Sequence, residues 1–205
     1  MNIKSKQIVD EVELVIGKLL KDISIEDLKS ITELIINNFD VDGSVNKFYL
    51  EDLDLFTNLK KLSFNDMIID TDTLMYINNH NIEELNLFNC ELLCDTNITF
   101  NNITTLRVEY TDNFKEEYLM LFPNLKELSF KGYKITKDLP KTITKLNLVN
   151  TTIEDLKVID NMNLSDLYIS KDEYEKNIDY YKKLLYVHVY DDNNIYLINS
   201  GDENE

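Results

Sequence analysis

The cysteine and histidine side chains are the first candidates for metal or nucleophilic chemistry in this sequence. Cys90 and Cys94 form a single Cys-x-x-x-Cys pair, and His80 is the one imidazole near them in the chain. A structural zinc site needs four ligands, and a nucleophilic cysteine needs a histidine that a third group orients. The spacing supports neither arrangement. We therefore expect both cysteines to be packing residues, and we predict no metal site.

The carboxylates and glycines also give no catalytic motif. Asp66, Asp70 and Asp72 have part of the spacing of a calcium loop, but the glycine at its sixth position and its closing glutamate are missing. Four glycines in 205 residues do not make a glycine-rich phosphate loop. We predict no catalytic residue, no cofactor and no enzymatic activity; the alternative is an enzyme with an unrecognised site.

The charge restricts the class of partner. The chain has 38 acidic and 21 basic side chains, a formal charge of −17, whereas a nucleic-acid-binding protein needs a basic face. We expect no nucleic acid partner, and the charge favours encounter with basic proteins. A highly charged chain of this kind is most simply a monomer.

No segment has the character of a membrane or export signal. Acidic residues at positions 10, 11 and 13 interrupt any apolar core near the start, and no stretch reaches 18 apolar residues. We therefore expect a cytoplasmic protein with no membrane association.

The apolar residues must position whatever function the chain has, and they repeat. The pattern apolar-x-x-apolar-x-apolar recurs about every 18 to 23 residues, which is the period of a stacked repeat. Six clear copies begin at Leu59, Ile82, Ile103, Leu125, Ile143 and Leu164, and two weaker ones at Ile36 and Leu184. The alternation in the second half of each copy predicts a short strand, and stacking of such units predicts a parallel sheet.

These copies resemble the leucine-rich repeat family, whose consensus is Leu-x-x-Leu-x-Leu-x-x-Asn/Cys-x-Leu. The resemblance covers residues 36–190, and the unit at residues 143–162 resembles the short internalin-type repeat through Thr151, Ile153, Asp155 and Leu156. The consensus Asn/Cys position holds Met67, Cys90, Thr111, Tyr133, Thr151 and Asp172. Only Cys90 is a standard occupant, so the other five depart from the family. We therefore expect the buried asparagine ladder to be mostly absent and the turns to be irregular.

The predicted fold is α/β: a leucine-rich repeat solenoid with a curved parallel β-sheet, a helical N-terminal cap and a β-hairpin-like C-terminal cap. We assign residues 1–35 to the helical cap, 36–190 to about eight repeats, and 191–205 to a cap strand and an acidic tail. The cap contains one helix over residues 4–21 and a second after Ser24 that extends through Ile35. Helical turns are expected in the return segments 116–121, 154–159 and 173–183.

The resemblance implies a protein-binding site on the concave face of the sheet. The central column of that face is predicted to be Asp40, Ser63, Asn86, Arg107, Ser129, Asn147, Tyr168 and His188. Aromatic side chains with polar tips are enriched in binding hot spots. The candidate partner-binding residues are therefore Phe88, Arg107, Tyr110, Tyr168, Tyr186, His188 and Tyr190.

Two of these assignments keep an alternative. The tyrosines and His188 at the C-terminal end can instead pack under the cap or simply suit a sheet surface. Arg107 is the only arginine in the chain, and it can instead form a charge ladder with Glu84, Glu109 and Glu127.

The predicted function is a non-catalytic protein–protein interaction module that holds a partner on the concave face. No effector domain is recognised in the sequence, so an adaptor, inhibitor or immunity-type role is expected. The alternatives are an enzyme with an unrecognised site or a structural fragment of a larger surface protein.

Overall fold

The computed structural model describes residues 2–38, 47–93, 98–160, 162–184, 186–191 and 194–198. The chain forms two compact units, residues 1–103 with 111–114, and residues 104–110 with 115–205. Each unit is built on parallel strands, with helices and smaller strand pairs in the segments that connect them.

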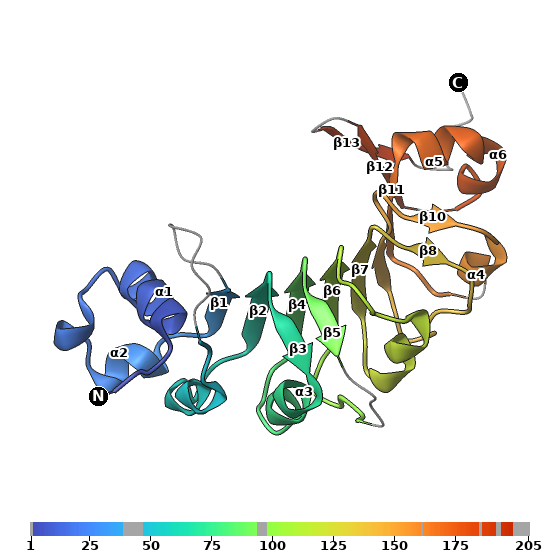
Figure 1. Cartoon of the computed structure of the whole chain (residues 1–205). Helices are drawn as coiled ribbons and strands as arrows, with labels where there is room; N and C mark the ends of the chain where they lie inside the picture. Colours follow the sequence, from blue (N-terminus) through green and yellow to red (C-terminus); the bar gives the residue numbers. More distant parts are fainter. Residues whose placement is uncertain are drawn as a thin grey trace. The chain divides into compact units, whose positions relative to one another are not determined.

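In the first unit, strands β1, β2 and β4 lie side by side in parallel (Figure 1). The register aligns Leu34 with Leu62 and Leu85, and these side chains are fully buried. The elements of this unit are α1 (Lys6–Ile16), η1 (Leu20–Asp22), α2 (Ile25–Lys29), β1 (Glu33–Asn37), η2 (Leu50–Leu55), β2 (Lys61–Asn65), β3 (Ile68–Asp70), α3 (Thr71–Asn78), β4 (Glu84–Phe88) and β5 (Glu91–Leu93), where η marks a 3₁₀ helix.

The predicted position of the first repeat is wrong. Strand β1 pairs Leu34 with Leu62 and Ile36 with Phe64, so its copy of the pattern begins at Ile31 and not at Ile36. The second helix also ends earlier than predicted, at Lys29, where the Ser30 hydroxyl donates to a backbone carbonyl of the last turn. The following run is rich in β-branched residues, which favour a strand. The predicted boundary at residue 35 therefore falls inside β1, and Asp40 lies outside the described residues.

The first helix is shorter than predicted, although the start of the second is confirmed. Helix α1 ends at Ile16 because Gly17 adopts a left-handed conformation, with φ of 71°. Ser24 is the N-cap of α2 and forms a capping box with Asp27. Of the apolar residues spaced along one side of this helix, Ile8 and Val12 are buried, whereas Val15 is exposed.

In the second unit, five strands run parallel in the order β6, β7, β9, β11 and β12, and β13 pairs antiparallel with β12. The elements are β6 (Thr105–Glu109), η3 (Glu116–Leu121), β7 (Glu127–Lys131), β8 (Lys134–Ile135), β9 (Lys145–Asn147), β10 (Thr152–Ile153), α4 (Lys157–Asp160), β11 (Asp166–Ser170), α5 (Lys171–Lys176), α6 (Ile178–Tyr181), β12 (Val187–Asp191) and β13 (Asn194–Ile198). Helical turns therefore occur in all three return segments where we predicted them.

In three repeats, the residue at the consensus asparagine position donates a hydrogen bond to a backbone carbonyl, although it is not an asparagine. The Cys90 thiol donates to the Phe64 carbonyl at 3.3 Å, the Thr111 hydroxyl donates to the Leu87 carbonyl at 3.3 Å, and the Thr151 hydroxyl donates to the Phe130 carbonyl. In each case the acceptor belongs to the last buried strand residue of an earlier repeat. Burial raises the pKa of the Cys90 thiol to about 11, so it keeps its proton at neutral pH and can donate. We call these three residues the turn ladder.

The expectation of irregular turns is therefore wrong. The residue just before the consensus asparagine position has a positive φ in five repeats: Asp66, Asn89, Tyr110, Gly132 and Asn150. Asparagine, aspartate and glycine tolerate this left-handed conformation, whereas a bulky side chain is strained there. Tyr110 is the exception, and its ring lies over Gly132, where an added Cβ would come within 2.6 Å of Tyr110 Cδ1.

The turn ladder makes a prediction for Thr151. Replacing Thr151 with Val keeps the shape of the side chain but leaves the buried Phe130 carbonyl without its donor. We expect Thr151→Val to lower the free energy of unfolding by about 1–3 kcal/mol in urea denaturation. Thr152 is an exposed neighbour, so Thr152→Val is the matched control and should change stability by less than about 0.5 kcal/mol. Equal effects of the two substitutions would contradict the role of the ladder.

Gly132 and Gly17 form a second matched pair, because both have a positive φ. Only at Gly132 would an added Cβ meet a neighbouring side chain. Gly17→Ala should cost about 1 kcal/mol of unfolding free energy from backbone strain alone. We expect Gly132→Ala to cost more, because its Cβ would also displace the Tyr110 ring. Adding Tyr110→Ala should remove the excess, as measured by chemical denaturation. Equal costs for the two glycine substitutions would show that the ring contact is unimportant.

Candidate functional site

The second unit presents a row of side chains on the sheet face opposite its buried apolar residues. We call this the open face. The register pairs Arg107 with Ser129, Ser129 with Asn147, Asn147 with Tyr168, and Tyr168 with His188. This part of the predicted central column is therefore confirmed. We call these five residues the central row.

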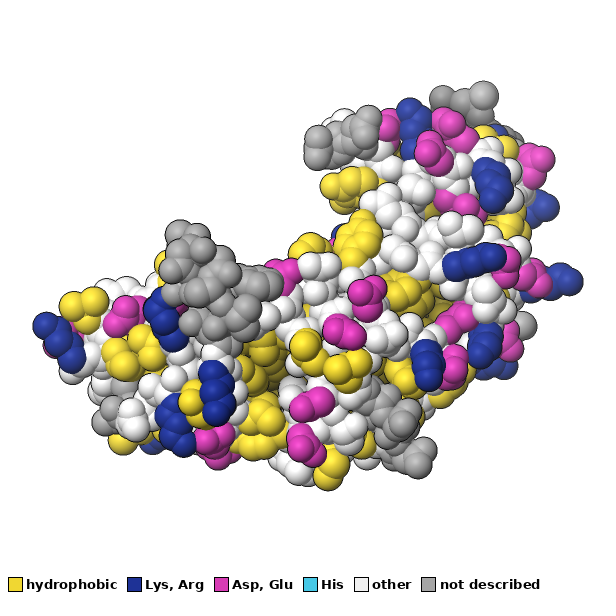
Figure 2. Space-filling model, in the orientation of Figure 1, with side chains coloured by type: hydrophobic (Ala, Val, Ile, Leu, Met, Phe, Trp, Pro, Cys, Tyr) yellow, Lys and Arg dark blue, Asp and Glu magenta, His cyan; other side chains and the backbone are white. Residues whose placement is uncertain are grey.

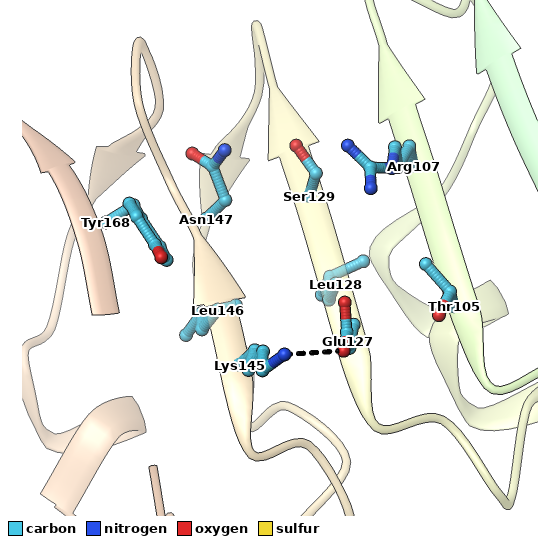
Figure 3. Close-up of a pocket in the computed structure, with 9 residues that line it drawn as sticks. All are labelled: Thr105, Arg107, Glu127, Leu128, Ser129, Lys145, Leu146, Asn147 and Tyr168. Atoms are coloured by element: carbon cyan, nitrogen blue, oxygen red, sulfur yellow. Dashed lines mark hydrogen bonds and ion pairs between the residues drawn. The ribbon is translucent and has the colours of Figure 1, made fainter. Parts of the chain in front are cut away.

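A shallow hollow of about 250 Å³ lies on the open face over β6, β7, β9 and β11. Figure 3 shows the side chains that surround it, with Arg107, Ser129 and Asn147 following one another across three strands. Its lining residues are Thr105, Arg107, Glu127, Leu128, Ser129, Lys145, Leu146, Asn147 and Tyr168. The hollow therefore offers mostly polar groups on a floor of strand residues.

Two contacts hold polar groups in place around the hollow. The Lys145 ammonium forms an ion pair with Glu127 at 2.9 Å (Figure 3). The Asn147 side-chain oxygen accepts a hydrogen bond from the Val149 backbone N–H at 3.1 Å. Because a backbone N–H can donate only to the amide oxygen, this bond fixes which end of the Asn147 amide is which.

The C-terminal end of the central row is an aromatic stack. The Tyr168 and His188 rings are nearly parallel, with centroids 4.3 Å apart and an angle of 10° between their planes. The Nε2 atom of His188 lies 2.9 Å from the Asp166 carboxylate. That hydrogen bond is the main cause of a lowered pKa for Asp166. This hydrogen bond holds the His188 ring of the stack in place.

An apolar patch continues from this stack onto the last hairpin. Antiparallel pairing aligns Tyr190 with Ile195 and His188 with Leu197, and directly opposite residues share one face of a sheet. Tyr190, Ile195 and Leu197 are 38%, 55% and 49% exposed. We call these three residues the hairpin patch. Figure 2 shows hydrophobic side chains exposed at the β12–β13 end of the second unit.

Ile195 and Leu197 were missed by the sequence analysis, which selected aromatic residues and Arg107 but no aliphatic residue. The signal that could have found them is the predicted β-hairpin-like cap, in which a strand within residues 191–205 pairs with the last repeat strand. Once the two strands are paired in antiparallel fashion, Ile195 must share a face with Tyr190.

The structure brings some predicted site residues together and leaves others apart. Tyr168, His188 and Tyr190 lie together, and Arg107 lines the hollow. Tyr186 is half-exposed but precedes β12 with a φ of 62°, so it is not part of a strand row. Phe88 is exposed but belongs to the first unit. Tyr110 is exposed at the turn after β6, over Gly132.

The glutamates expected near Arg107 all have lysine partners. The N–O distances are 3.4 Å for Glu84–Lys61, 3.1 Å for Glu109–Lys131 and 2.9 Å for Glu127–Lys145. Lysines therefore neutralise at least part of the charge that we assigned to a ladder with Arg107.

Neither a metal-binding cluster nor a membrane-spanning helix occurs among the described residues. They contain no group of three or more histidine, cysteine, aspartate or glutamate side chains arranged to hold a metal ion. Within the same residues, no helix is both long enough and apolar enough to cross a membrane.

Comparison with known proteins gives similarity at the level of structure. No protein-family model and no curated protein sequence matches the chain. Two solved structures of internalins from Listeria monocytogenes are similar to it. For InlF the identity is 17%, the TM-score is 0.43, and the match covers 90% of this chain and 68% of the internalin. For InlC2 the identity is 15%, the TM-score is 0.41, and the match covers 92% and 77%.

The assignment of a leucine-rich-repeat-like α/β fold rests on the chain's own features. Each of the six clear copies of the apolar pattern contains a strand that pairs in parallel with a neighbouring strand. In three repeats, the side chain at the consensus asparagine position donates a hydrogen bond to a carbonyl of an earlier repeat.

The contact between Asp166 and His188 makes a prediction for pH dependence. The folded pKa of Asp166 lies below its ordinary value of 3.8. Its contribution to the free energy of unfolding is therefore present above the unfolded pKa and is lost as the pH falls through the folded one. Between about pH 5 and about pH 3 the wild type should lose more stability than Asp166→Asn, as measured by urea denaturation. Parallel losses in the two proteins would contradict this assignment.

Proposed function

We propose that the chain is a non-catalytic protein-binding module that uses the open face of its second unit. The observation that carries the proposal is the hairpin patch, three exposed apolar or aromatic side chains beside the Tyr168–His188 stack. Exposed apolar patches rimmed by polar groups mark interaction sites in soluble proteins. Tyrosines with an apolar body and a polar tip are common in binding hot spots.

The polar hollow supports the same proposal because it lies directly beside the stack, with Tyr168 belonging to both. An apolar anchor next to directional polar groups is the usual composition of a specific interface. The central row, the hollow and the hairpin patch are together the proposed partner surface.

The finer parts of the proposal concern architecture and role. We propose that α1 and α2 cap one end of the repeats and that the β12–β13 hairpin caps the other, because each lies at a chain end of the strand series. The charge of −17 supports a basic protein partner through long-range attraction. An adaptor, inhibitor or immunity-type role in the cytoplasm, as a monomer, fits a binding surface without catalytic groups.

The proposal is tested with a variant of the hairpin patch, Tyr190→Ala/Ile195→Ala. Partners captured from lysate by the wild type are identified by mass spectrometry, purified and titrated by biolayer interferometry. We expect the variant to bind at least about tenfold more weakly, because two anchor side chains are removed. Both side chains are exposed, so the variant should fold, which circular dichroism verifies.

The matched control is Leu14→Ala/Ile25→Ala, which removes two exposed apolar side chains from the first unit. This control should bind the partner like the wild type. Equal affinity of the hairpin-patch variant and the wild type would exclude the open face as the partner surface. Loss of binding in both variants would indicate a nonspecific apolar contact and would also contradict the proposal.

A further inference from the structure

We propose that the hollow on the open face binds a carboxylate of the partner, either an acidic side chain or a C-terminal carboxylate. This inference rests on the proposed function, because it assigns the chemistry of one part of the proposed partner surface. It is carried by the arrangement of hydrogen-bond donors around the hollow.

The amide of Asn147 provides the first donor. Its oxygen is engaged by the Val149 backbone N–H at 3.1 Å, so its Nδ2 group lies on the other side. Figure 3 shows this nitrogen on the side of the amide that faces Ser129. A fixed amide N–H₂ is a donor only, and an incoming ligand must therefore supply an acceptor.

Ser129 and Arg107 extend this donor row. Ser129 is paired in register with Asn147 on one side and with Arg107 on the other. Adjacent strands are about 4.8 Å apart, so an oxygen placed above Ser129 is within reach of groups on all three strands. Figure 3 shows the Arg107 guanidinium on the side of Ser129 away from Asn147.

The charge of the lining distinguishes the hollow from the rest of the chain. Arg107 and Lys145 contribute two positive charges and Glu127 one negative charge, which gives +1 for the lining residues. The chain as a whole has a formal charge of −17. Lys145 is held at the edge of the hollow by Glu127, at 2.9 Å. The lining of the hollow therefore contains more basic than acidic side chains, unlike the chain as a whole.

A carboxylate fits these groups better than a neutral amide does. An ionised carboxylate only accepts hydrogen bonds, and charge-assisted bonds are about twice as strong as neutral ones. A carboxamide offers the donors one neutral acceptor oxygen, whereas a carboxylate offers two charged ones. The volume of about 250 Å³ accommodates the end of one side chain or a chain terminus.

The test uses acetate as the probe and the full chain with ¹⁵N labelling. Sodium acetate is titrated at constant ionic strength while the Asn147 side-chain N–H₂ signals are followed by NMR. We expect saturable shifts with a dissociation constant of about 10 mM, a reasonable affinity for so small a ligand. Acetamide at the same concentrations should give no saturable shift.

The decisive variant is Asn147→Asp. It keeps an oxygen that can accept from Val149 but replaces the N–H₂ donor with a second carboxylate oxygen. Acetate binding, followed through the backbone amides of the hollow, should weaken by more than tenfold. Ser129→Ala removes one hydroxyl and should weaken binding by about two- to tenfold. Undiminished acetate binding by Asn147→Asp, or equal shifts with acetamide, would overturn the proposal.

Two further probes distinguish the source of the carboxylate. N-acetylglycine represents a chain terminus, and N-acetylglutamate α-amide represents an acidic side chain; the tighter ligand identifies the source. If neither bound, the proposal would be overturned.

The hairpin-patch variant separates this inference from the proposed function. Tyr190→Ala/Ile195→Ala should bind acetate normally because neither residue lines the hollow. Acetate binding without any effect of this variant on partner affinity would retain the hollow as a carboxylate site but exclude the open face as the partner surface. If the variant lost partner affinity but acetate did not bind the hollow, the partner surface would be retained and the carboxylate site excluded.

Discussion

In three of the described repeats, the turn after the strand satisfies a backbone carbonyl of an earlier repeat. An unpaired buried carbonyl costs free energy comparable to a lost hydrogen bond, and stacked repeats would accumulate that cost. The turn ladder meets the requirement with a thiol or a hydroxyl from Cys90, Thr111 and Thr151. Each accepting carbonyl belongs to the last buried residue of a core strand. The alignment of neighbouring strands, and so the rows on the open face, depends on this turn.

The residue just before each turn-ladder position has a left-handed backbone conformation. This conformation redirects the chain so that the ladder side chain points inward, where it can reach the carbonyl. Four of the five turns use aspartate, asparagine or glycine there, which bear the conformation at little cost. Tyr110 bears it at a greater cost, and its ring rests on Gly132, the residue with the least steric demand. Tyr110 is thus an exposed aromatic residue in a strained turn, as is Tyr186 before β12, and such strain clusters at functional sites.

The open face of the second unit combines two kinds of interaction. The hairpin patch offers apolar area, which supplies affinity without direction. The hollow offers fixed donors, which supply direction and select the chemistry of the group that enters. Tyr168 joins the two, since its ring stacks on His188 and also lines the hollow. The proposed partner surface can therefore be specific without a large contact area.

The sequence by itself determined the six clear repeat strands, because a regular apolar spacing admits one register when no competing apolar residues overlap it. It did not determine the first repeat. Ile31–Leu34–Ile36 and Ile36–Phe39–Val41 both match the pattern, and only the pairing of β1 with β2 selected the former.

Most of the candidate site was decided by tertiary structure. Tyr168 and His188 could be predicted as neighbours from the repeat, whereas Ile195 and Leu197 joined them only through antiparallel pairing with β12. The donor row around the hollow depended on the Val149 N–H that orients Asn147. Apolar spacing determines which residues are buried, since burial is a property of each strand. Which exposed groups meet depends on contacts between strands, and these exist only after folding.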